Sequence, residues 1–94
     1  MTKAIWNNIV IAESDETIVI ENNHYFPPSS INQVYLKTTD IQSTCPWKGQ
    51  AHYLNLEIDG QVNPEAAWRY PNPSDAASQI KDYVAFGNGV QVEA

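Results

Sequence analysis

Turn-forming residues interrupt this chain so often that only short strands fit between them. Combinations of Asn, Asp, Gly and Pro mark five such places: Asn7-Asn8, Pro27-Pro28, Asp59-Gly60, Pro71-Asn72-Pro73 and Gly87-Asn88-Gly89. The runs between them are rich in β-branched and aromatic residues, and no alternating series of strands and helices is present. The sequence therefore predicts a mostly β fold of antiparallel sheets, arranged as a sandwich or a partly open barrel. The 94 residues form one small domain, residues 1–94.

Local patterns predict individual hairpins and one short helix. The clearest strand covers residues 51–58, and one of its faces carries His52, Leu54, Leu56 and Ile58. Three hairpins are expected where two apolar runs flank a short turn: residues 51–58 with 61–62, residues 9–12 with 17–20, and residues 84–86 with 90–92. The one helix that we expect begins at Ser74 or Asp75 and runs to about residue 81 or 82, near the C-terminal end of the chain.

The charge balance argues against polyanionic partners. The chain has 5 basic and 11 acidic residues and a net charge of −6, and its basic residues form no block. Because nucleic-acid binding draws most of its affinity from Lys and Arg contacts to phosphate, neither a nucleic acid nor an anionic membrane is expected as a partner. No apolar stretch approaches the roughly 20 residues of a membrane span, and no secretory leader pattern is visible. A cytoplasmic location is the default expectation.

A single cysteine, Cys45, limits the covalent and metal chemistry of the chain. One cysteine makes neither an internal disulfide nor a multi-cysteine zinc site. Cys45, His52 and His24 with a carboxylate would make a nominal ligand set, but their spacing lacks the close pair that zinc sites usually show. We therefore expect no metal and no cofactor.

The segment from Thr44 to Gly49 concentrates reactive and aromatic side chains before the strongest strand. In one hypothesis it is catalytic, with Cys45 as a nucleophile whose thiolate form is favoured by Lys48. A histidine, His52 or His24, would then act as the base. The alternative is that Cys45 is simply a small buried apolar residue, as free cysteines often are.

A second hypothesis treats the same region as a recognition site. The expected ligand-binding residues are one lysine and five aromatic residues: Trp47, Lys48, Tyr53, Trp68, Tyr70 and Tyr25. The rings would form apolar walls, and Lys48 or Arg69 would bind an anionic or carbonyl group. The alternative is that some rings belong to the core, because Trp68 and Tyr70 are spaced to share one buried face.

The same residues resemble a known family. The pattern Thr-x-Cys-Pro-aromatic-Lys-Gly-x-Ala-x-aromatic ends at Tyr53, and further matches are Tyr25-Phe26-Pro27, Ala66-Ala67-Trp68, Tyr70-Pro71 with Pro73, and Tyr83-Val84-Ala85-Phe86. Over nearly the whole chain the sequence resembles the domain of unknown function 427 family. That resemblance implies a β-tent-like fold, in which antiparallel sheets meet at an angle with a cleft between them. It also brings a nucleotidyltransferase-like label, although paired metal-binding carboxylates and a glycine-rich phosphate cradle are not visible here.

Together these features favour a small domain that binds a small ligand in an aromatic-lined cleft around the Cys-Pro-Trp-Lys-Gly turn. One alternative is an enzyme, either a thiol-dependent transferase or reductase or the nucleotidyltransferase of the family label. Another is a domain for protein interaction or homodimerisation through an open sheet edge. The expected partner is a small molecule, and the expected state is a monomer or a weak homodimer.

Overall fold

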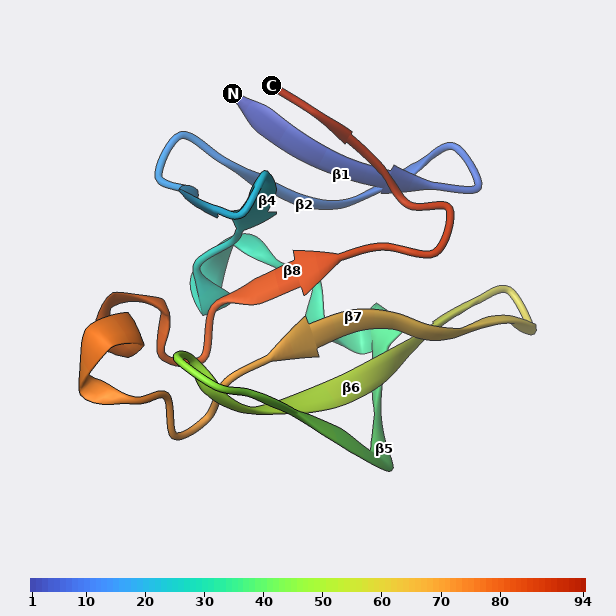
Figure 1. The fold of residues 1–94 in the computed structure, drawn as a ribbon. Coiled ribbons are helices and arrows are strands. Elements are labelled where there is room, and N and C mark those ends of the chain that lie inside the picture. The colour runs from blue at the N-terminus through green and yellow to red at the C-terminus, as the bar shows by residue number, and fades with distance from the viewer.

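The computed structural model describes residues 1–94 and is built almost entirely from antiparallel strands (Figure 1). The nine strands are β1 (Thr2–Trp6), β2 (Ile9–Ser14), β3 (Ile18–Ile20), β4 (Asn23–Tyr25), β5 (Leu36–Cys45), β6 (Gly49–Ile58), β7 (Gln61–Arg69), β8 (Val84–Phe86) and β9 (Gln91–Glu93). Three short 3-10 helices join them: η1 (Pro28–Ser30), η2 (Gln33–Tyr35) and η3 (Asp75–Ile80). The predicted mostly β, antiparallel fold class is confirmed.

The strands form three sheets, ordered β2-β1-β9, β3-β4 and β5-β6-β7-β8. Phe26 and Val84 exchange two backbone hydrogen bonds of 2.8 and 3.0 Å, which attach the small β3-β4 sheet to the β8 edge of the large one. The sheet of β1, β2 and β9 lies across this assembly from β6 and β7, and both chain ends lie in it side by side (Figure 1).

The main core fills the space between the three-stranded and four-stranded sheets. Leu54, Leu56 and Ile58 of β6 point into it, as their alternation predicts. They pack with Ile11 of β2 and with an edge-on pair of rings, Phe26 and Phe86, whose centroids lie 5.6 Å apart. Face-to-face burial of apolar side chains between sheets is the main stabilising term of such a fold.

The opposite face of the large sheet carries a second, more aromatic cluster. Its buried members are Tyr25, Ala51, Tyr70, Ala77, Ile80 and Ala85, and the side chains of Cys45, Tyr53 and Trp68 pack against them. β6 therefore contributes apolar side chains to both of its faces near residue 51. The candidate site lies on this second face.

The turns at Asn7-Asn8 and Asp59-Gly60 are confirmed, and each joins two paired strands. Both turns require positive φ at their central residues, which Asn7, Asn8, Asp59 and Gly60 supply at 52°, 61°, 50° and 79°. Asn and Asp tolerate this left-handed region better than most residues, and Gly has no side chain to oppose it.

Two other predicted hairpins are wrong. Residues 9–12 pair with β1 rather than with residues 17–20, and β3 pairs with β4 instead. Residues 84–86 pair with β7, whereas β9 pairs with β1. The side-chain amide of Asn88 donates to the backbone carbonyls of Pro64 and Glu65, at 3.1 and 3.0 Å, so the turn is held on β7 while the chain crosses to the other sheet.

The predicted C-terminal helix occurs as the 3-10 helix η3, interrupted at Ala77 (φ −117°, ψ 16°). Only Ala77 and Ile80 in this segment are buried, and their three-residue spacing suits the 3-10 geometry better than a longer α-helix. No helix in the structure is both long enough and apolar enough to span a membrane.

Candidate functional site

The Cys-Pro-Trp-Lys-Gly segment is the hairpin turn between β5 and β6, with Cys45 paired opposite Gly49. The turn is docked on the segment before η3: the Ser74 N–H donates to the Lys48 carbonyl at 2.8 Å, and the Ser74 hydroxyl donates to the Trp47 carbonyl. Gly49 is required here, since its φ is +112° and an added Cβ would lie 3.3 Å from the carbonyl oxygen of Asn72. The turn thus helps to close the fold.

Lys48 folds back from this turn into the aromatic cluster and is only 5% exposed. Its ammonium forms an ion pair with Glu21, in the turn between β3 and β4. The same nitrogen lies 6.0, 5.4 and 5.5 Å from the ring centroids of Tyr25, Trp47 and Tyr70, which is cation–π distance. Lys48 is therefore enclosed by partners from its own chain.

These contacts shift the ionisation of the groups around Lys48. Burial disfavours its charge, but the hydrogen bond to Glu21 and the nearby Tyr25, Tyr70 and Cys45 outweigh burial and raise the pKa of Lys48. The hydrogen bond and the charge of Lys48 lower the pKa of Glu21. Burial, together with Tyr25, raises the pKa of Tyr70 to about 12. At neutral pH Lys48 and Glu21 are thus charged, and Tyr70 keeps its proton.

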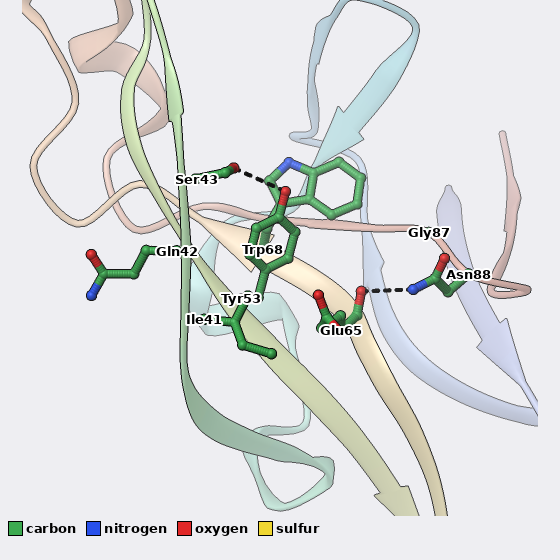
Figure 2. A pocket seen from close by; sticks show the side chains of 8 residues that line it. All are labelled: Ile41, Gln42, Ser43, Tyr53, Glu65, Trp68, Gly87 and Asn88. Atoms are coloured by element: carbon green, nitrogen blue, oxygen red, sulfur yellow. Dashed lines mark hydrogen bonds between the residues drawn. The ribbon is translucent and has the colours of Figure 1, made fainter.

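Next to this enclosed cluster, the same face of the sheet is hollowed at the surface (Figure 2). The hollow has a volume of about 380 Å³ and is lined by Ile41, Gln42, Ser43, Tyr53, Glu65, Trp68, Gly87 and Asn88. Tyr53 of β6 and Trp68 of β7 are directly opposite in register, and their rings lie 6.4 Å apart at 51°. The two rings form a tilted corner on the wall of the hollow.

Three contacts hold these rings in place. The Trp68 indole N–H donates to the Tyr25 hydroxyl at 3.2 Å, and the hydroxyls of Tyr53 and Ser43 lie 3.1 Å apart, as the dashed line in Figure 2 shows. Gly87 lies against the edge of Trp68, where an added Cβ would be 3.1 Å from the ring. The corner is thus pre-formed by neighbouring side chains.

The polar rim of the hollow is created by a bulge in β7. The pairing register shifts between Leu54 and Leu56, and Glu65 takes a positive φ of 53°. The Glu65 N–H donates to the Asn55 side chain at 2.9 Å, and the Asn88 amide donates to the Glu65 carbonyl (Figure 2). Glu65 itself is exposed, so its carboxylate stands at the edge of the hollow.

The structure divides the residues proposed from the sequence among neighbouring places. Tyr53 and Trp68 line the hollow, while Tyr25 and Tyr70 lie in the buried cluster with Lys48. The other lining residues, which no sequence pattern marks as part of a site, are Ile41, Gln42, Ser43, Glu65, Gly87 and Asn88. Trp47 is 41% exposed on the turn, and Cys45 is half-buried against the aromatic cluster.

The histidines and Arg69 lie away from the hollow. His24 on β4 is 3.0 Å from the Thr17 hydroxyl, and His52 pairs with Arg69 on the face opposite to Tyr53 and Trp68. No three His, Cys, Asp or Glu side chains lie together as a metal-binding group. Arg69, considered above as a group that could bind an anion in the aromatic cleft, therefore faces away from Tyr53 and Trp68, because successive strand residues point to opposite faces.

Comparison with known proteins identifies the family of the chain. No curated protein matches the chain. The family model labelled NTP_transf_9, described as Domain of unknown function (DUF427), matches residues 1–94, the entire length. The chain therefore belongs to the DUF427 family.

Proposed function

We propose that this domain binds a small, flat ligand in the hollow beside Tyr53 and Trp68. The observation that carries the proposal is the ring corner itself: two aromatic side chains border an open hollow and are held in place by contacts with Ser43, Tyr25 and Gly87. Both rings pack against the buried cluster on one side and are only partly buried, so part of each ring faces the hollow. Apolar walls with a few fixed polar groups are typical of small-molecule sites.

The dimensions support a ligand of one or two rings. Ligand pockets usually enclose about 300–1,000 Å³, and the 380 Å³ of this hollow lies at the small end of that range. Because Tyr53 and Trp68 are tilted by 51°, a flat ring can stack on one of them while it meets the edge of the other.

The charges favour a neutral or cationic ligand over an anion. Glu65 is the charged side chain among the lining residues, and the chain as a whole carries −6. Lys48, which the sequence suggested as the partner of an anion, is paired with Glu21 and enclosed by rings. The Asn88 side-chain N–H groups are bonded to the carbonyls of Pro64 and Glu65, so its side-chain carbonyl oxygen and the Tyr53–Ser43 hydroxyl pair are the polar groups left for the edge of a ring.

This assignment has more support than the enzyme hypotheses. A thiol mechanism assisted by Lys48 would need an ammonium free to act on Cys45, whereas this ammonium is committed to Glu21. Nucleotidyl transfer usually relies on paired carboxylates that hold two metal ions, and the hollow offers only Glu65.

The test is a fragment screen read by NMR on the isotope-labelled chain. The probes are one- and two-ring aromatic compounds in neutral, cationic and anionic sets. We expect hits from the neutral or cationic sets to shift the indole N–H of Trp68 and the amides of Tyr53 and Asn88. The indoles of Trp6 and Trp47 serve as internal controls, since neither residue lines the hollow. Hits that shift only Trp47, or no hits at all, would contradict the proposal.

We also propose that the domain acts in the cytoplasm as a monomer or a weak homodimer, without nucleic-acid or membrane partners. The outer edge of β5 is open to pairing, but the bulge between Thr38 and Gln42 bends it sharply (Figure 1). Sedimentation velocity over a range of concentrations measures the state; a stable dimer at low concentration would contradict the proposal.

A further inference from the structure

Arg69 is a charged residue that belongs neither to the lining of the hollow nor to the apolar core. Lys3 pairs with Glu13 and Lys48 pairs with Glu21, whereas Lys37, Lys81 and Arg69 take part in no ion pair; of these three, only Arg69 is half-buried. Its Nε is buried and has no hydrogen-bond partner in the protein. The chain has 11 acidic residues, so carboxylates are abundant. More than about 90% of buried polar groups are hydrogen-bonded in native proteins, and an exception calls for a physical explanation.

The strand register places two further polar side chains beside Arg69. Arg69 on β7 is directly opposite His52 on β6, which in turn is opposite Gln42 on β5. Directly opposite residues share one face of a sheet, with Cβ atoms about 5 Å apart. Gln42, His52 and Arg69 therefore form a row across three strands, which we call the Arg69 row.

The side chains of the Arg69 row lie on the face of the sheet opposite to the Tyr53–Trp68 ring corner, although Gln42, on the edge strand, also borders the hollow. Leu54 and Ala67, two residues from His52 and Arg69, belong to the main core, whereas Tyr53 and Trp68 point to the other side. In Figure 2 the side chain of Gln42 points away from Tyr53, as this alternation requires.

The row is rich in hydrogen-bond donors and contains no acid. A guanidinium offers five N–H groups in a planar fork, an imidazole at least one, and a carboxamide two. On β8 the residue opposite Arg69 is Val84, so the register adds no carboxylate there. His52 and Arg69 are half-buried and Gln42 is exposed, so water reaches part of the row although the Arg69 Nε itself is buried.

We propose that the Arg69 row binds an oxyanion, a phosphate or carboxylate group, at a site separate from the aromatic hollow. The Arg69 guanidinium receives two oxygens of the anion side by side, which is the bidentate geometry that arginine forms with both groups. His52 and Gln42 complete the contact from the neighbouring strands. The partial burial of Arg69 strengthens this attraction, because the surroundings have a lower dielectric constant than water.

The test is an NMR titration of the full labelled chain with sodium phosphate and, separately, with sodium acetate. Sodium chloride at equal ionic strength is the reference for both. With at least one anion we expect saturable shifts of the Arg69 Nε–H and of the His52 and Arg69 amides. The anion that saturates at the lower concentration identifies the ligand as a phosphate or a carboxylate. If neither anion gives saturable shifts beyond chloride, the proposal is wrong.

Three variants test whether the anion binds at Arg69. Lys37→Gln removes an exposed charge of the same sheet, opposite Asn55 and outside the row, and is expected to bind as the wild type does. Arg69→Gln is expected to lose the saturable shifts, and Arg69→Lys to bind about tenfold more weakly because it lacks the fork. Retained shifts in Arg69→Gln would overturn the proposal. If Arg69→Gln does not fold, the titration of the Arg69 Nε–H signal in the wild type still tests the proposal.

Discussion

Gly87→Ala is the substitution that most directly tests whether Trp68 is a movable wall of the hollow or part of a rigid core. Gly87 is not among the residues with positive φ, so its backbone accepts alanine. The new Cβ would lie 3.1 and 3.5 Å from two atoms of the Trp68 ring. Since carbon atoms normally pack at about 3.5–4.0 Å, the ring must move by roughly 0.5 Å.

The expected loss of stability is small because Trp68 has room to move. Overpacking costs about 1–3 kcal/mol, and the low end applies to a half-buried ring beside open space. Alanine also restricts the unfolded chain, which offsets about 0.4–1 kcal/mol. The free energy of unfolding should therefore fall by no more than about 1 kcal/mol, while the 3.2 Å hydrogen bond from Trp68 to Tyr25 is disturbed.

Urea unfolding measures the stability, and the Trp68 indole N–H resonance reports the movement of the ring. Gly60→Ala is the matched control: it has no atom within 4 Å of the added Cβ but a φ of +79°. Its cost is backbone strain of about 1 kcal/mol, with no shift at Trp68. A loss above about 3 kcal/mol in Gly87→Ala would mean that Trp68 is locked in the core. An unchanged indole signal would refute the close approach of Gly87 to the Trp68 ring.

Three further predictions concern the enclosed cluster. Glu21→Gln should destabilise the protein at neutral pH. Because the pKa of Glu21 is lowered from its ordinary value of 4.5, its ion pair with Lys48 adds stability above that pH, and the difference in stability between wild type and variant should disappear as the pH falls through and below 4.5. A difference that does not depend on pH would contradict this role of the ion pair. Tyr25→Phe removes the acceptor of the Trp68 indole N–H, so the free energy of unfolding in urea should fall by about 1 kcal/mol and the indole N–H resonance should shift. If neither the stability nor the resonance changes, the hydrogen bond is not present. Cys45→Ser should keep the fold and the binding of fragment hits, because the thiol lies outside the hollow; loss of binding in a folded variant would favour the thiol-dependent hypothesis.

The parts of the fold that were predictable are those set by neighbouring residues. The alternation in residues 51–58 fixes the buried face of β6, and Asp59-Gly60 fixes the hairpin that follows. The partners of β2 and β9 were not predictable in this way, because both pair with β1, and β9 comes from the far end of the chain. A local turn signal such as Asn88-Gly89 shows that the chain bends but not which sheet it enters.

In the candidate site, too, only the residues marked by local sequence were predictable. Tyr53 and Trp68 were identifiable because aromatic residues on strands are frequent in ligand sites. The rim was not, since Glu65 and Asn88 meet through a bulge and a crossover that only the assembled sheets create. The sequence also did not reveal that Lys48 would be taken up by Glu21, a residue 27 positions away.

The central claim is that the hollow beside Trp68 binds a small flat ligand, and a matched pair of tryptophan variants tests it most directly. The measurement is the dissociation constant of the best fragment for wild type, Trp68→Phe and Trp47→Phe. The smaller ring at position 68 should weaken binding about three- to tenfold, whereas Trp47→Phe, which alters an exposed turn residue outside the lining set, should leave it unchanged. Equal affinity for wild type and Trp68→Phe, or a loss confined to Trp47→Phe, would contradict the account.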